Sequence, residues 1–326
     1  MPTRAGATSE PPANRDARQR SALWQANHIS GQLKKLHGVE SELIRIRTSG
    51  DRMQSAPVAQ INEQIGAEMG GKGIFIKELE DALLANTIDL AVHSMKDVPT
   101  EIPPGLAFPA ITRREDPRDC LISRTGRSLK GLPAGARIGT SSLRRQAQLH
   151  HHRPDLEVVN LRGNVDTRLK KLDAKEFDAV VLAMAGVNRL GFTGRISQVL
   201  DESVMLPAVG QGALGIETRA DDARTSELVA ALNDPESRAC VTAERALLHE
   251  LQGGCQVPLG ALARLAGDAL RIEAAVFSAD GKEFVRREEQ GTAADPAGAG
   301  KRLGQALLEA GADRILRLAG RTVGLG

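Results

Sequence analysis

Short apolar strands alternate with amphipathic helices along much of this chain, and this alternation restricts the fold more than any other feature. The helical pattern IFIKELEDALLANT is followed by IDLAVHSMKDVP, an apolar strand that ends in polar residues before Pro99. Another apolar strand, residues 136–139, leads into the helical pattern TSSLRRQAQLHHH. The segments LEVVN, GNVDTRLKKL and FDAVVLAMAGVNRLG then follow as strand, helix and strand. Strands that alternate with helices predict parallel α/β sheets, whose ligands bind at the carboxyl ends of the strands.

The length of the chain indicates more than one core. Its 326 residues are 41% hydrophobic and 26% charged, an ordinary globular composition for two or three domains. The segment LPAVGQGALG, residues 206–215, is dense in Pro and Gly and is typical of a crossing between lobes. After Pro235 the pattern changes to a helix, a loop, the two hairpin strands LRIEAAVFS and KEFVRREE, and a late helix at about 299–310, which predicts a C-terminal α+β domain.

Composition argues against several classes of protein. The 43 Lys and Arg nearly balance 41 Asp and Glu, and aromatic residues are only 2%, which disfavours a nucleic-acid partner. The three cysteines lie far apart without a Cys-x-x-Cys or Cys/His cluster, so we expect no metal and a reducing, cytoplasmic compartment. The chain has no apolar run long enough for a membrane span, and its first residues are polar. We therefore expect no membrane partner.

Basic residues gather where the strand patterns pass into helices. A single arginine there is more often a solvated helix residue, but five at such junctions favour a carboxylate or phosphate site. In TSSLRR, Thr140 or Ser141 is expected to cap a helix whose first N–H groups face an anion. The five arginines are Arg144, Arg145, Arg162, Arg168 and Arg189.

The end of the strand in IDLAVHSMKDVP places an acid beside a base. The pattern is compatible with Asp97 as a catalytic carboxylate. It is equally compatible with Asp97 as a turn residue before Pro99 that pairs with Lys96 at the surface. His93, on the same strand, more often satisfies a buried hydrogen bond than transfers a proton. The local pattern leaves both interpretations of Asp97 open.

The three cysteines differ in their surroundings. Cys255 lies in the loop GGCQ, where two glycines reduce the cover over the thiol, so a covalent anchor and a buried structural thiol are equally compatible with the pattern. Cys120 and Cys240 lie among helix or strand residues and are expected to be small buried hydrophobes.

Several motifs, taken together and in this order, resemble the hydroxymethylbilane synthase family, also called the porphobilinogen deaminases. The resemblance covers the chain from about residue 22 to its end. The motifs are GGKGIFIKELE (70–80), DLAVHSMKDVP (89–99), REDPRD (114–119), GTSSLRRQAQL (139–149), LRGNVDTRL (161–169), LPAVGQGALGIE (206–217), ERALL (244–248) and LQGGCQVPLGA (251–261).

The resemblance implies an enzyme, a transferase of tetrapyrrole biosynthesis. Four porphobilinogen molecules add in turn, each losing ammonia, to a covalent dipyrromethane primer, and water then releases hydroxymethylbilane. One dipyrromethane per chain is expected on Cys255 through a thioether, and Asp97 matches the catalytic carboxylate, which stabilises positive charge on the reacting ring. By motif position, the resemblance assigns cofactor binding to Lys96, Thr140, Ser141, Ser142, Arg144, Arg145, Arg162 and Gly163, and substrate binding to Arg18, Lys72, Arg168 and Arg189.

The arginines suit this chemistry because each pyrrole ring carries an acetate and a propionate, so a six-ring chain brings about twelve carboxylates. The usual opening of the family, an apolar strand ending in Thr-Arg or Ser-Arg, is absent from PPANRDARQRSALWQ, and Arg18 is matched with a gap. The segment around Glu68 is longer than usual. No metal is expected.

The resemblance also implies three domains, of which two are α/β lobes like those of periplasmic binding proteins, joined by a hinge. We expect a disordered tail at 1–16, then domain 1 at 17–112 and 213–230 with a lid loop at 53–73, domain 2 at 118–206 and domain 3 at 235–326. A monomer is expected. The alternative is a non-catalytic two-lobed protein that binds a carboxylated ligand, but such a protein needs neither Cys255 in a glycine loop nor Asp97 in a cationic crevice.

Overall fold

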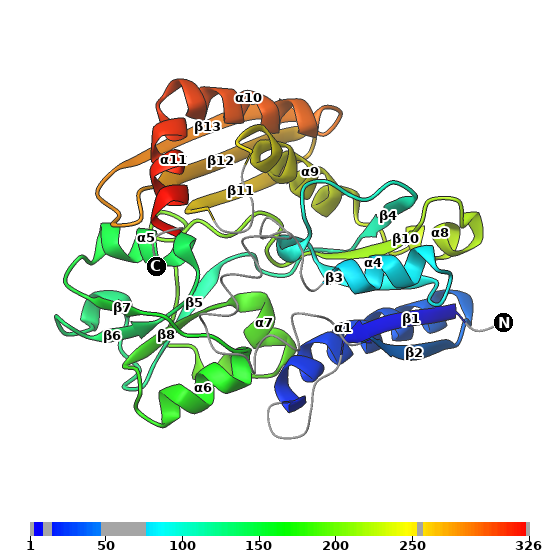
Figure 1. Ribbon diagram of the computed structural model, residues 1–326, viewed down its shortest axis with the longest axis horizontal. Coiled ribbons are helices and arrows are strands. Elements are labelled where there is room, and N and C mark those ends of the chain that lie inside the picture. Colours follow the sequence, from blue (N-terminus) through cyan, green and yellow to red (C-terminus); the bar gives the residue numbers. More distant parts are fainter. Residues whose placement is uncertain (1–2, 9–14, 47–75, 253–256, 324–326) are drawn as a thin grey trace. The chain divides into compact units, whose positions relative to one another are not determined.

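A computed structural model describes residues 3–8, 15–46, 76–252 and 257–323 of the chain (Figure 1). The chain divides into two compact units: residues 1–113 with 213–238, and residues 114–212 with 239–326. The predicted α/β class is confirmed in both units, and the second unit also contains a separate antiparallel sheet. Among the described helices, none is both long and apolar enough to cross a membrane.

The first unit is built on a five-stranded sheet in the order β2-β1-β3-β10-β4. β1, β2 and β3 run parallel, and β10 runs antiparallel to both β3 and β4. Side chains of α1 and α8 pack with those of β3, β4 and β10 in one core, while side chains of α4 pack with those of β3 in another. The elements are β1 (Thr3–Thr8), α1 (Arg15–His37), β2 (Ser41–Ile46), α4 (Lys77–Leu84), β3 (Leu90–Ser94), the 3-10 turn η1 (Met95–Asp97), β4 (Leu106–Ile111), β10 (Leu214–Arg219) and α8 (Ala223–Ala230).

The expectation of a disordered tail at residues 1–16 is wrong for the described part of that range, residues 3–8 and 15–16. Thr3–Thr8 form β1, which pairs with β2 on one side and with β3 on the other, and α1 begins at Arg15. The segment TRAGAT has no run of large apolar residues, so its local pattern does not reveal a strand. Its pairing with two distant segments determines the conformation, as is common for strands.

The second unit repeats this sheet design in the order β7-β6-β8-β5-β9, again with the antiparallel strand in fourth place. Successive residues of β5 and β8 enter opposite cores: Leu121 and Val181 pack on one face, and Cys120 and Val180 on the other. The sheet is therefore buried on both faces, as its apolar strands predict. Its elements are β5 (Asp119–Ser123), η2 (Leu129–Gly131), β6 (Arg137–Gly139), α5 (Leu143–His152), β7 (Glu157–Val159), α6 (Val165–Asp173), β8 (Ala179–Ala183), α7 (Met184–Arg189), η3 (Thr193–Arg195) and β9 (Gln198–Val199).

The strand expected in FDAVVLAMAGVNRLG covers only its first half. β8 ends at Ala183, and residues 184–189 form α7. Apolar residues continue through both elements, and such a run does not distinguish a buried strand from a short buried helix.

The C-terminal part is an antiparallel meander of three strands packed against helices, which confirms the predicted α+β architecture. Side chains of the sheet, α9, α10 and α11 share one core, which includes Leu247, Ile272 and Leu303, each fully buried. The expected hairpin strands are β12 and β13, while β11 and α11 were not predicted. These elements are α9 (Pro235–Glu250), β11 (Leu259–Ala266), β12 (Ala269–Phe277), β13 (Phe284–Thr292), α10 (Pro296–Glu309) and α11 (Ala312–Val323).

The predicted domain ranges can be placed on these units. Range 118–206 and nearly all of range 235–326 lie in the second unit, and range 17–112 with 213–230 lies in the first. The lid expected at residues 53–73 lies outside the described residues.

Candidate functional site

The first unit presents Asp97 at the end of β3. The backbone there is anchored on both sides: Met95 N donates to Ala213 O over 3.0 Å, and Val98 N donates to Met95 O over 3.3 Å. Met95 is buried whereas Asp97 is exposed and Lys96 half-buried. The turn η1 therefore holds a solvent-facing carboxylate beside a lysine on a fixed support.

Two neighbouring side chains of β3 are engaged within the fold. His93 Nε2 lies 2.9 Å from Glu217 Oε2 of β10, and both side chains are buried. Ser94 Oγ accepts a hydrogen bond of 3.1 Å from Gln25 Nε2 of α1. His93 is buried and its ring faces a carboxylate of the next strand, but Nε2 makes no hydrogen bond with a described residue, so the expected buried hydrogen bond is not confirmed.

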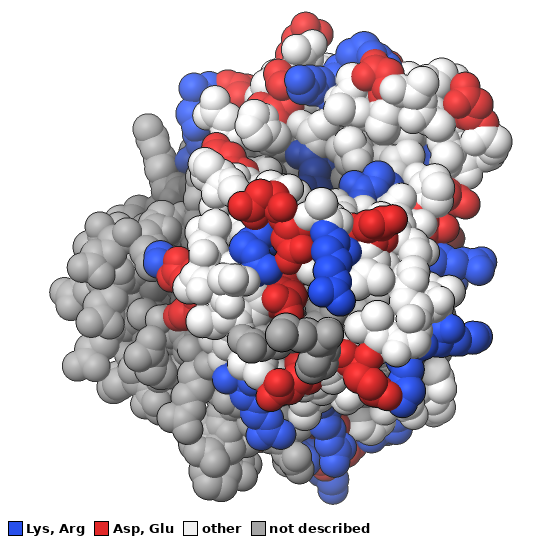
Figure 2. All heavy atoms as spheres, turned by 90° about the vertical axis from the view of Figure 1, so that its right-hand side faces the viewer, with Lys and Arg blue, Asp and Glu red and all other residues white. Residues whose placement is uncertain are grey.

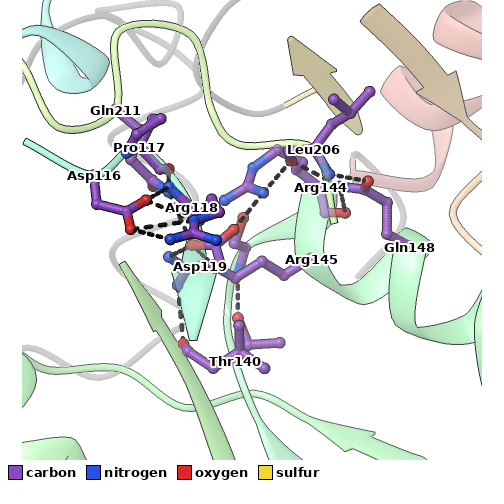
Figure 3. A network of polar contacts seen from close by, with 12 residues as sticks. Asp116, Pro117, Arg118, Asp119, Thr140, Arg144, Arg145, Gln148, Leu206 and Gln211 are labelled. Atoms are coloured by element: carbon purple, nitrogen blue, oxygen red, sulfur yellow. Dashed lines mark hydrogen bonds and ion pairs between the residues drawn. The ribbon is translucent and has the colours of Figure 1, made fainter. Parts of the chain in front are cut away.

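In the second unit, Arg144 and Arg145 converge on one carboxylate, that of Asp119 (Figure 3). Arg144 Nη1 donates to Asp119 Oδ2 over 2.7 Å, and Arg145 donates to Oδ1 from Nη2 over 2.7 Å and from Nε over 3.2 Å. A further hydrogen bond of 2.9 Å comes from Gln211 Nε2 to Oδ1. Asp119 is completely buried, and Arg144 and Arg145 are 4% and 6% exposed.

The electrostatics of this cluster favour an ionised Asp119. Burial by itself raises the pKa of this carboxyl, but the charges and hydrogen bonds of Arg144 and Arg145 outweigh burial and hold the pKa well below its usual range. Burial lowers the pKa of Arg144, which the charge of Asp119 opposes. Two guanidinium ions and one carboxylate leave a net charge of one positive in a buried place.

One donor of this cluster is not used. Arg144 Nε is buried and has no hydrogen-bond partner among the described residues, although Nη1 of the same side chain donates to both Asp119 and Leu206 O. A buried donor without a partner costs free energy. The excess positive charge and this donor are what a ligand carboxylate requires, so the cluster fits the carboxylates of a dipyrromethane.

The start of α5 differs in one respect from the expectation. Its N-cap is Ser142, not Thr140 or Ser141, and the Ser142 side chain caps no backbone N–H of the helix. Thr140 Oγ1 instead accepts from Ser142 N over 3.3 Å, and Thr140 O accepts from Gln146 Nε2 over 3.0 Å. Local sequence did not resolve which of three consecutive hydroxyl residues begins the helix, because all three are favourable N-caps.

A second helix start, that of α6, holds Gly163 and Arg168 together. Gly163 has φ of 115°, a conformation that favours glycine, and its O accepts from Arg168 Nε over 2.7 Å. Asn164 caps the helix by accepting from Thr167 N over 2.9 Å. Arg162, just before this turn, is exposed.

Arg189 lies at the end of α7. Its Nη2 donates to Gly212 O over 2.8 Å. Burial lowers its pKa, and the nearby charge of Glu115 acts in the opposite direction. Arg189 is thus half-buried beside the segment that leads out of the second unit.

The described structure leaves some predicted site residues without a position. Cys255 and Lys72 lie outside the described residues, and for Arg18 only its place in α1 is described. In the described part of the chain, no group of three or more His, Cys, Asp or Glu side chains is arranged to hold a metal ion.

Several buried polar residues beside the arginines were missed by sequence reasoning. Asp119 and Arg114 belong to the motif REDPRD, and Gln211 belongs to LPAVGQGALG, but neither motif shows which partner each residue has. Arg114 donates to Glu244 from Nη1 over 2.6 Å and from Nη2 over 3.1 Å. Acidic and amide residues inside otherwise apolar or glycine-rich motifs were the available signal, because buried polar groups need partners.

Fold and site together define a class: a two-lobed α/β protein with a C-terminal α+β part, an exposed carboxylate at a strand end, and buried arginines suited to a polycarboxylate. Comparison with known proteins shows the family to which the chain belongs. Residues 18–227 match the family model described as "Porphobilinogen deaminase, dipyromethane cofactor binding domain", and residues 238–309 match "Porphobilinogen deaminase, C-terminal domain". The chain belongs to the porphobilinogen deaminase family.

Sequences of known relatives are similar to this chain along nearly its whole length. The porphobilinogen deaminase of Pelobacter propionicus is 50% identical over 303 residues, 93% of this chain and 92% of that protein. That of Syntrophobacter fumaroxidans is 48% identical over 90% of this chain and 93% of its own length. Among solved structures, the methionine-binding protein MetQ aligns with 71% of this chain and 89% of its own, at 13% identity and a TM-score of 0.42.

Membership of this family makes the chain an enzyme. It is a transferase of tetrapyrrole biosynthesis that carries a dipyrromethane cofactor and forms hydroxymethylbilane from porphobilinogen. The alternative of a non-catalytic binding protein is not favoured.

Proposed function

We propose that residues of both units take part in this reaction: Asp97 acts on the reacting ring, and the basic residues of the second unit bind carboxylates. The proposal depends most on one observation, the buried and unused Nε of Arg144 in a cluster with one excess positive charge. Charge-assisted hydrogen bonds from arginine to carboxylate are strong because the guanidinium presents parallel donors. When bound, the dipyrromethane would supply the primer from which the pyrrole chain is extended.

The part of Asp97 follows from its exposure and its support. Positive charge develops on the substrate pyrrole as the new bond forms, and a carboxylate near the ring N–H stabilises that charge. The same carboxylate can accept a proton that leaves the ring. Because η1 is anchored by backbone hydrogen bonds to Ala213 and Met95, Asp97 needs little reorganisation during the reaction.

The remaining basic residues are assigned to the acetate and propionate groups. Arg144, Arg145, Arg162 and Lys96 would hold the cofactor, with Thr140, Ser141, Ser142 and Gly163 at the two helix starts. Arg168, Arg189, Lys72 and Arg18 would contact the incoming substrate. Cys255 would carry the thioether.

The test of Asp97 is the variant Asp97→Asn, which keeps the shape and removes the charge. We expect hydroxymethylbilane formation to fall about 100-fold or more, since a positioned carboxylate that acts both by charge and by proton transfer contributes at least that much. Asp81→Asn is the matched control, because Asp81 is an exposed residue of the same unit that pairs with Lys77 at the surface. Product formation by Asp97→Asn at the rate of that control would refute the role.

The test of the attachment site is the intact mass of the protein after incubation with porphobilinogen. We expect a dipyrromethane-sized adduct on the peptide that contains Cys255 and none on those that contain Cys120 or Cys240, which are buried. Cys255→Ser should carry no adduct. An adduct retained by Cys255→Ser, or found on another peptide, would contradict the assignment.

We also propose that the chain acts as a monomer in the cytoplasm without a nucleic-acid partner. Its charges nearly balance, 43 basic against 41 acidic residues. On the face drawn in Figure 2, basic and acidic side chains are interspersed, which does not favour binding to a polyanionic surface. Light scattering of the purified chain tests the monomer, and a mass of twice that of the chain would refute it.

A further inference from the structure

Asp119 contacts both arginines at the start of α5. It begins β5, and its two oxygens receive donors from Arg144, Arg145 and Gln211 (Figure 3). Arg144 and Arg145 are consecutive in a helix, so their side chains leave the axis about 100° apart. Asp119 accepts from both side chains and so brings the two guanidinium groups to the same point.

Each guanidinium also donates to a backbone carbonyl. Arg145 Nη1 donates to Val181 O over 3.0 Å, and Arg144 Nη1 donates to Leu206 O over 2.5 Å. Leu206 is itself fixed, because its N donates to Gln148 Oε1 over 2.8 Å and its O accepts from Gln148 Nε2 over 3.1 Å. The two long side chains therefore lose their rotamer freedom when the protein folds, and not when a ligand binds.

The cluster is not complete as a purely structural ion pair. A structural pair in a buried place satisfies all of its donors, whereas Arg144 Nε has no partner among the described residues. Asp119 accepts a hydrogen bond from Nη1 of Arg144 and none from Nε of that side chain. The charge that remains, one positive, matches one carboxylate.

We infer that Asp119 is a positioning residue for the cofactor: it holds Arg144 and Arg145 so that the unused Nε of Arg144 meets a single carboxylate of the dipyrromethane. This inference rests on the proposed function. It assigns a role to an acidic residue in addition to the carboxylate-binding arginines. Asp119 would not itself contact the ligand, because both carry negative charge. Gln211, which donates to the same oxygen, supports Asp119 from the segment that leads out of the second unit.

The experiment follows the loading of the full chain with its cofactor. Protein made in cells that produce no porphobilinogen is incubated with increasing porphobilinogen, and the adduct on Cys255 is timed by mass. Asp119→Asn keeps the shape of the side chain and removes the charge. Asp178→Asn is the matched control, because Asp178 follows a turn of the same unit and pairs with Arg124 at the surface.

We expect Asp119→Asn to load tenfold or more slowly and to need a higher porphobilinogen concentration for half-maximal loading, while Asp178→Asn loads as the wild type does. All proteins are compared at a temperature where circular dichroism shows each to be folded. A merely structural role for Asp119 would lower the loadable fraction at every concentration and leave the half-maximal concentration unchanged, and that result would overturn the inference, as would loading at the wild-type rate.

A milder variant covers the case in which Asp119→Asn does not fold. Gln211→Met removes one donor to Asp119 without changing any charge, and we expect it to load severalfold more slowly with the same rise in half-maximal concentration. Unchanged loading of Gln211→Met would then overturn the inference. A wild-type chain that acquires no adduct would refute the proposed function itself, whereas a wild type that loads alongside an unaffected Asp119 variant refutes only the positioning role.

Discussion

Replacement of Glu244 by Gln should unfold the second unit at a markedly lower denaturant concentration. Glu244 is completely buried on α9, and its two oxygens accept four hydrogen bonds. Arg114 Nη1 and Ala263 N donate to Oε1 over 2.6 and 2.8 Å, while Arg114 Nη2 and Gly210 N donate to Oε2 over 3.1 and 2.7 Å. This one carboxylate therefore connects a helix, a strand and the segment before Gly212.

The magnitude follows from what Glu244→Gln leaves behind. The amide has the same shape, but its NH₂ group faces two N–H donors, and Arg114, whose side chain is 10% exposed, loses its counter-ion. Removal of one partner of a buried ion pair costs about 3–5 kcal/mol, because the other charge stays buried without its counter-ion. We expect a loss of that size in the free energy of unfolding.

Urea unfolding followed by far-UV circular dichroism measures this loss, and hydrogen exchange locates it. The amides of Gly210 and Ala263 should lose protection, since both donate to Glu244. Glu273→Gln is the control: its side chain and that of its partner Arg286 are 23% and 30% exposed, so the cost should stay below about 1 kcal/mol. If Glu244→Gln costs no more than this control and both amides stay protected, the reasoning is refuted.

Three further predictions concern the second unit. Gly281→Ala should lower the free energy of unfolding, measured by thermal unfolding, by about 2–4 kcal/mol, because φ is 70° and a Cβ would lie 2.5 Å from Ala147 O. Its control is Gly267→Ala, where φ is 62° and the space is open, so that only the cost of the backbone conformation remains. Equal losses in the two variants would contradict the clash. The low pKa of Asp119 means that the unfolded chain binds more protons below about pH 4, so stability should fall there as pH decreases, and Asp119→Asn should show a shallower fall in urea unfolding; an equally steep fall would argue against it. Burial, and then the charge of Asp119, raises the pKa of Cys120 to about 12, so iodoacetamide at pH 8 should label this thiol only after unfolding, and labelling of the native protein would count against the structure.

The sequence motifs indicated the family, and the local patterns predicted most of the helices and strands. Helix and strand patterns in IFIKELEDALLANT, LEVVN and LRIEAAVFS correspond to α4, β7 and β12, because amphipathic periodicity is a local property. β1 was missed, since TRAGAT becomes a strand only through its pairing with β2 and β3. β11 and α11 were missed as well.

For the site, residue types were predictable and their partners were not. That arginines follow strand ends, and that Asp97 ends a strand, can be read from the order of residues alone. That Arg144 and Arg145 both face Asp119, which lies 25 and 26 positions away, depends on β5 and α5 meeting in the fold. Charge in a sequence shows a capacity to bind an anion, whereas burial and geometry decide how much of that capacity an internal carboxylate already uses.

The α/β class, the family and the chemical character of the site are therefore predictable from the order of residues, because they depend on periodicity and on motifs that are continuous in the chain. That Asp119 neutralises half of the arginine pair and leaves Arg144 Nε for a ligand is seen only in the folded protein. The reason is physical: hydrogen bonds between buried groups act over about 3 Å, and distances of that order between residues far apart in the chain exist only after folding.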